Sequence, residues 1–251
     1  MRLVWKERQL NRSLAQHREA QIKSWARIEK EALVKGRRRR HSRPIFFRAK
    51  TQPAEEGVFH LTQEVLSKNV AIGDELTGPY WQCGVVDVTR GTMAYQRGDR
   101  IVAPTRSTHG IFLPPFSIIR AVLSRCRGQW NGLTSKKRLP KGAPRRPVIF
   151  APSSSGAPST ISEMMSLLEG AKESLDVGRA ASPSKTALEI KKALERAYDR
   201  PERLSDIAGA LRMSPARFAR TFKQAFEMPP VEYRRELKRV DEMWRAFSSS
   251  V

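Results

Sequence analysis

The spacing of apolar residues changes along this chain, and the changes divide it into regions. Over residues 3–35, Leu10, Leu14, Trp25, Ile28 and Ala32 fall roughly on one helical stripe. From about residue 44 to 150 the apolar residues gather in short runs broken by Gly, Pro and Asp, which is the spacing of strands. After residue 185 helical spacing returns. The pattern predicts an α+β chain with a β-rich middle region.

The middle region carries the strand signals. Turn signals at 97–99, 113–115 and 127–128 separate the runs, so a small barrel or sandwich whose interior has room for a ligand is expected. The predicted strands are Cys83–Val88, Thr92–Tyr95, Ile101–Ala103, Ser117–Leu123 and Val148–Phe150.

Residues 151–184 read as a linker that contains one helix, over Thr160–Asp176. Its apolar stripe is either part of the core or a docking surface that pairs with a second subunit. The stripe consists of Ile161, Met165, Leu168, Ala171 and Leu175.

The C-terminal region, 185–251, predicts several short helices. Leu204, Ile207, Ala208 and Leu211 form one stripe, and Ser214 followed by Pro215 is a strong start signal for the next helix. Phe218 and Phe222 should pack against the preceding helix. The opposite face then presents Arg and Lys beside small Ala residues, as in helices that read a DNA groove.

At these residues the chain resembles the AraC/XylS family of bacterial transcriptional regulators. The resemblance lies in Leu204-Ser205-Asp206-Ile207-Ala208, Met213-Ser214, Phe218-Ala219-Arg220-Thr221-Phe222-Lys223, and then Pro230, Tyr233 and Arg234. It implies a helix-turn-helix unit that binds double-stranded DNA. The implied DNA-binding residues are Ser214, Ala216, Arg217, Ala219, Arg220, Lys223 and Arg234.

The chain departs from the family pattern in two ways. Arg212 and Glu227 stand where the family usually has Gly, so a conserved backbone path would cost about 1 kcal/mol at each. The second helix-turn-helix unit of the family is also missing. The apolar stripe of Leu237, Val240, Trp244 and Phe247 therefore lacks its usual partner, and self-association and a shortened gene product both stay open.

A fainter resemblance covers the middle region. Gly91-Thr92, Gly98-Asp99, Pro104 and His109 are similar to the cupin-like effector domain of the same family. It implies a pocket for a small effector, with Trp81, Tyr95 and His109 as candidate residues. Metal binding would need further His and Glu ligands, so His109 is read as a turn or pocket residue and no metal is expected.

The net charge of the chain also points to a nucleic-acid partner. The formal net charge of +22 favours a polyanion, and the first 50 residues hold 16 basic against 4 acidic residues. The run from Lys35 to Arg43 reads as a phosphate-binding arm, a solvated tail or an import signal. Cys83 and Cys126 form no disulfide framework, and no apolar run has the length of a signal peptide or membrane span. We therefore expect a cytoplasmic protein that does not enter a membrane.

The expected organisation is α+β, with a cupin-like sensor domain and an all-α helix-turn-helix domain. The ranges are a basic helical or disordered extension (1–43), the β-rich domain (44–150), the linker (151–184) and the DNA-binding domain (185–251). No catalytic pair, nucleophile elbow or phosphate loop appears, so neither an enzyme nor a cofactor is expected. Expected partners are DNA, RNA polymerase, a small effector and a second copy. The alternative is a basic nucleic-acid-binding or scaffold protein with a degenerate helix-turn-helix and no sequence preference.

Overall fold

The computed structural model describes residues 46–67, 70–97, 100–152, 156–171, 174–177 and 183–249. All of these residues belong to one compact unit, which spans 44–251. The predicted N-terminal helix and the basic run Lys35 to Arg43 lie outside the described residues.

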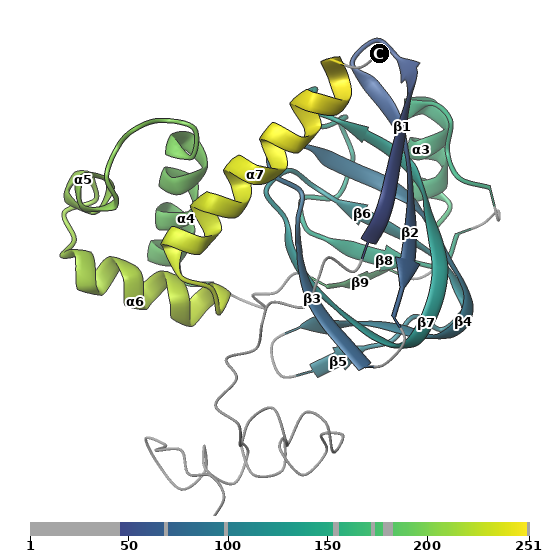
Figure 1. The fold of residues 1–251 in the computed structure, drawn as a ribbon, viewed down its shortest axis with the longest axis horizontal. Coiled ribbons are helices and arrows are strands. Elements are labelled where there is room, and N and C mark those ends of the chain that lie inside the picture. The colour runs from purple at the N-terminus through teal and green to yellow at the C-terminus, as the bar shows by residue number, and fades with distance from the viewer. Residues whose placement is uncertain are drawn as a thin grey trace, which may run out of the picture. The chain divides into compact units, whose positions relative to one another are not determined.

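One antiparallel sheet forms the middle of the chain (Figure 1). Its main path runs β1-β2-β7-β4-β6-β8-β9, with β3 on β7 and β5 on β4. The strands are β1 (Phe46–Glu55), β2 (Val58–Leu66), β3 (Val70–Leu76), β4 (Trp81–Arg97), β5 (Arg100–Val102), β6 (Thr108–Leu113), β7 (Ile118–Ser135), β8 (Val148–Phe150) and β9 (Ser174–Asp176). The expected β-rich region is confirmed as one antiparallel sheet.

Strands β4 and β7 pair along most of their length and form the centre of the sheet. The turn predicted at 127–128 is wrong, because β7 runs through it without a break. Gly128 instead permits close strand approach: a Cβ there would lie 2.4 Å from the carbonyl oxygen of Asp87. Gly91, with φ of +73°, lies in the bulged part of β4, where a Cβ would lie 2.3 Å from the carbonyl oxygen of Arg125.

The predicted helix Thr160–Asp176 is shorter than expected. Helix α3 covers Ile161–Glu169, the Thr160 hydroxyl accepts from Glu163 N, and the helix ends at Gly170. Residues 174–176 form β9 instead, paired with β8. Met164 and Leu167 are buried in one core of the sheet, and Met165 packs partly against it. Met164 and Leu167 lie outside the predicted stripe, whose residues Ile161, Met165, Leu168 and Ala171 pack only partly against this core, while Leu175 in β9 is 43% exposed. The stripe is thus partly core, and its pairing with a second subunit stays a prediction.

Four further helices follow, giving five in the described part of the chain: α4 (Lys185–Ala197), α5 (Leu204–Ala210), α6 (Pro215–Phe226) and α7 (Pro230–Ser249). They share a core that includes Ile190, Leu194, Ile207 and Phe218. Ser214 caps α6, as predicted, and Ser184 caps α4 in the same way. Among the described helices, none combines the length and the apolarity that a membrane span requires.

Helix α7 belongs to two cores. Tyr233 and Leu237, in its first half, lie in the core of the helices. Val240 and Trp244, farther along, lie in the main core of the sheet, where the Trp244 and Tyr80 ring centroids are 5.3 Å apart. The expectation that this stripe lacks a partner is thus wrong for its described side chains, because the core of the helices covers Leu237 and the core of the sheet covers Val240 and Trp244. The Phe247 side chain lies outside the described residues.

Candidate nucleic-acid interface

A tight turn joins α5 to α6. Arg212 adopts a left-handed φ of +53°, and Met213 N donates to the carbonyl oxygen of Ala208 at 2.9 Å. The Ser214 hydroxyl then accepts from Arg217 N at 3.3 Å and caps α6, with Pro215 at the first helical position. The backbone at Arg212 therefore takes the conformation that glycine would adopt without strain.

The inner face of α6 is aromatic. Phe218, Phe222 and Phe226 are all buried. The Phe222 ring centroid lies 4.7 Å from that of Phe226 and 5.2 Å from that of Tyr233 in α7. This packing confirms the predicted direction of Phe218 and Phe222 and fixes which face of α6 meets solvent.

The outer face of α6 is basic and open to solvent. Six of the predicted DNA-binding residues are exposed on this helix or at its cap: Ser214, Ala216, Arg217, Ala219, Arg220 and Lys223. The structure shows no ion pair or side-chain hydrogen bond between any of the three cations and another described residue. Within the described part of the chain, these three positive charges therefore lie on one face beside small alanines and have no ion-pair partner.

The seventh predicted residue, Arg234, lies apart from this face. Its guanidinium donates to the carbonyl oxygens of Arg200 and Glu202, in the segment between α4 and α5. The structure therefore gives Arg234 a bracing contact within the helical region, and a direct contact with DNA stays a prediction.

The end of α6 is tied to the sheet. Glu227 follows the helix with φ of +52°, and its Oε2 lies 3.0 Å from Nη1 of Arg120 in β7. The Arg120 side chain is only 15% exposed, so one partner of this ion pair is shielded from solvent. Sequence reasoning identified the unusual residue at 227 but had no means to find its partner.

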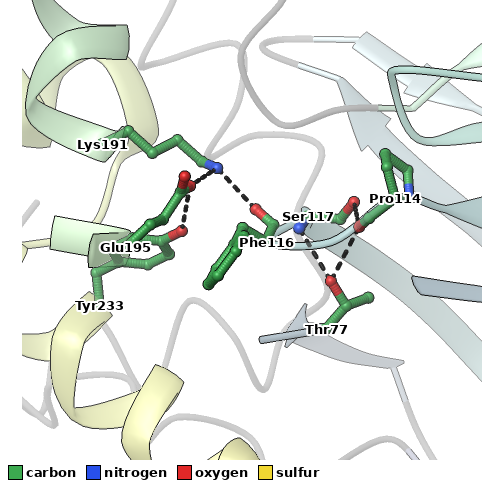
Figure 2. A network of polar contacts seen from close by, with 7 residues as sticks. All are labelled: Thr77, Pro114, Phe116, Ser117, Lys191, Glu195 and Tyr233. Atoms are coloured by element: carbon green, nitrogen blue, oxygen red, sulfur yellow. Dashed lines mark hydrogen bonds and ion pairs between the residues drawn. The ribbon is translucent and has the colours of Figure 1, made fainter. Parts of the chain in front are cut away.

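A second contact joins α4 to the loop before β7 (Figure 2). Lys191 Nζ donates to the carbonyl oxygen of Phe116 at 2.8 Å and also contacts Glu195, which accepts from the Tyr233 hydroxyl at 3.2 Å. Phe116 has φ of +60°. In the same loop, the Ser117 amide donates to the Thr77 hydroxyl at 3.0 Å.

A third contact centres on Asp241 of α7, a carboxylate that is 2% exposed. Burial alone would raise the pKa of Asp241, but hydrogen bonds from Lys136, Tyr198 and Arg245 outweigh it and lower that pKa. Lys136 lies in the sheet region and donates to Oδ1 at 3.2 Å. Burial and then the Asp241 charge raise the pKa of Tyr80 to about 12.

The predicted effector pocket is only partly assembled. Tyr95 and His109 meet in the main core of the sheet, with Oη and Nε2 2.8 Å apart. Trp81 is fully buried in the other core, beside α3. The hollow at His109 is small, about 20 Å³, and its lining includes Thr105, Arg106 and Phe150. Among the described residues, no group of three or more His, Cys, Asp and Glu is placed to hold a metal ion.

No protein-family model matches the chain, and no curated protein matches it. Among solved structures, it is similar to a cupin 2 domain-containing protein from Halorhodospira halophila. That match has 15% identity and a TM-score of 0.25, and it covers 39% of this chain and 69% of the other. A similarity of this size assigns neither fold nor function.

Proposed function

We propose that this protein is a sequence-specific DNA-binding regulator of the AraC/XylS type, with α6 as its reading helix. The observation that carries the proposal is the two-sided character of α6. Phe218 and Phe222 bind it to the helical core, while Arg217, Arg220 and Lys223 extend from the opposite face. Clustered cations on one face of a supported helix match the polyanionic surface of DNA.

The small residues on the same face support groove binding over simple charge attraction. Ala216 and Ala219 are exposed and leave the helix surface low between the long cations. The major groove is about 12 Å wide and accepts a helix, and arginine can donate two hydrogen bonds to a guanine edge. We therefore assign base reading to Arg220 and phosphate contacts to Arg217 and Lys223.

The test compares the full chain with a triple variant, Arg217→Ala/Arg220→Ala/Lys223→Ala. Fluorescence anisotropy with duplex DNA, from 50 to 300 mM salt, measures both the affinity and its dependence on salt. The triple variant should lose affinity, and its log–log salt slope should fall by about 2, since the variant loses the two assigned phosphate contacts and each contributes about 0.9. Lys192→Ala, which removes an exposed cation of α4, is the control and should leave affinity nearly unchanged. Equal binding by the triple variant and the control would contradict the proposal.

The second candidate is nucleic-acid binding without sequence preference, which the net charge of +22 favours. Both candidates lose affinity with salt. Only a regulator discriminates among sequences, typically by 10³-fold or more over non-specific DNA. Competition by unlabelled random DNA therefore separates the two.

A second copy of the chain is part of the proposal. One helix reads only a few base pairs, so a monomer is expected to bind at roughly 10⁻⁴ to 10⁻⁶ M, and two linked readers gain about 10² to 10⁴ in affinity. RNA polymerase and a small effector remain proposed partners. Sedimentation with and without a binding site tests the dimer, and a monomer that binds one short site tightly would contradict it.

A further inference from the structure

The first residues of β7 contact three different parts of the described chain. Ile118 is buried in the core of the helices, while its neighbour Ile119 is buried in the main core of the sheet. Arg120, the next residue, pairs with Glu227 at the end of α6. Three consecutive positions therefore connect the interior of the sheet, the helical core and the end of the basic helix.

The backbone of Glu227 is strained. Its φ of +52° is a left-handed conformation in which a side chain is strained and Gly is not. The strain exists whether or not the carboxylate has a partner. The structure gives the side chain a specific contact that glycine would lack, the ion pair with Arg120 across 107 residues of sequence.

Further contacts bind the segment just before Arg120 to the helices. Lys191 of α4 binds the Phe116 carbonyl just before β7, as Figure 2 shows, and the Phe116 and Tyr198 ring centroids lie 6.3 Å apart. The start of β7 is thus bound to α4 as well as to α6. Rotation of α6 against the helical core would separate Glu227 from Arg120.

We propose that Arg120 and Glu227 are positioning residues that fix the orientation of α6 relative to the sheet. Resting on the proposed function, this assigns control over the basic face of α6 to the start of β7. A change in the packing of Ile119 inside the sheet reaches α6 through the adjacent Arg120, with no contact between the sheet interior and DNA.

Hydrogen exchange of the full chain without DNA tests the positioning. Glu227→Gln keeps the shape and the backbone strain of the side chain but removes its charge. We expect exchange at residues 224–228 and 118–121 to rise about two- to fivefold, since the pair is partly exposed. Arg120→Gln should have the same effect, and the double variant should add little to either single one, because both remove one interaction. Glu189→Gln, on the exposed side of α4, is the control and should change neither segment.

Two outcomes overturn the proposal. One is unchanged exchange in Glu227→Gln, and the other is fully additive effects in the double variant, which would show that the two residues act separately. DNA affinity is the second readout. Glu227→Gln should weaken binding two- to fivefold with an unchanged salt slope, because neither residue contacts a phosphate, and Glu227→Asp should recover part of the loss. Absence of DNA binding by the unmodified protein contradicts the proposed function alone, because the exchange result is independent of it.

Discussion

The Tyr95 hydroxyl and Nε2 of His109 lie 2.8 Å apart in the interior of the sheet. The two rings meet nearly edge to face, at an interplanar angle of 78°. His109 is 3% exposed, and burial lowers its pKa to about 4, with partial compensation from the Ser107 backbone. The folded protein therefore holds His109 in its neutral form at pH 7.

This burial predicts a loss of stability in mild acid. The unfolded chain takes up a proton on this histidine below pH 6.5, whereas the folded chain does so only below about pH 4. The free energy of unfolding should thus have its full value above pH 6.5 and fall by about 3 kcal/mol between pH 6.5 and 4. Urea unfolding at several pH values measures it. His109→Gln should flatten the profile, with His60→Gln as the control, and an unchanged profile in His109→Gln would contradict the assignment.

Asp241 joins α7 to the sheet region and to α4, so we expect its replacement to destabilise the fold. Asp241→Asn should lower the free energy of unfolding by about 2 kcal/mol, because it weakens hydrogen bonds to charged groups. Lys136→Ala should cost less, since Arg245 still contacts the carboxylate. Chemical unfolding of both variants checks the order. A larger loss of stability in Lys136→Ala than in Asp241→Asn would contradict this ranking of the contacts.

Trp244 should contribute strongly to stability through the main core of the sheet. Trp244→Ala is expected to cost about 3–5 kcal/mol, as large-to-small changes of buried aromatics do. Sedimentation of the unmodified chain and of Trp244→Phe adds a second test. Because Trp244 is covered within the chain, the two proteins should have the same oligomeric state. A small stability loss in Trp244→Ala would contradict the packing of α7 on the sheet.

Ser214 allows helix capping to be separated from DNA contact. Ser214→Ala removes the cap of α6 and should cost about 1 kcal/mol of stability. Ser214→Asp retains a capping side chain, so stability should hold, but its negative charge should weaken DNA binding through repulsion of phosphate. Thermal unfolding and anisotropy together check the pair. If Ser214→Asp binds DNA as well as the unmodified chain, Ser214 does not lie at the interface.

Local signals explain what the sequence could predict. Ser214-Pro215 and the spacing of Phe218 and Phe222 each depend on neighbours within one helical turn, so the start of α6 and its exposed face were both predictable. The same applies to Arg212, where a residue at a glycine position retains the left-handed backbone.

The features that the sequence did not predict depend on strand curvature and on partners that lie far apart in the sequence. In β2 the buried residues Val58, Leu61 and Val65 are three and four positions apart, so the strand lacks the alternation that marks a regular strand. Bulges in β4 shift the alternation, and Trp81 and Tyr95 therefore enter different cores although both have odd positions. Arg120 and Glu227 are 107 residues apart, and no local pattern connects them.

The central claim is that α6 reads DNA sequence, and selection of binding sites from a random duplex library tests it most directly. The unmodified chain should enrich a defined motif. Arg220→Ala should lose preference at one or two base pairs and about 1–3 kcal/mol of affinity, whereas Lys223→Ala should weaken all sequences alike and keep the motif. Failure of the unmodified chain to enrich any motif, or an unchanged motif in Arg220→Ala, would contradict this account of α6.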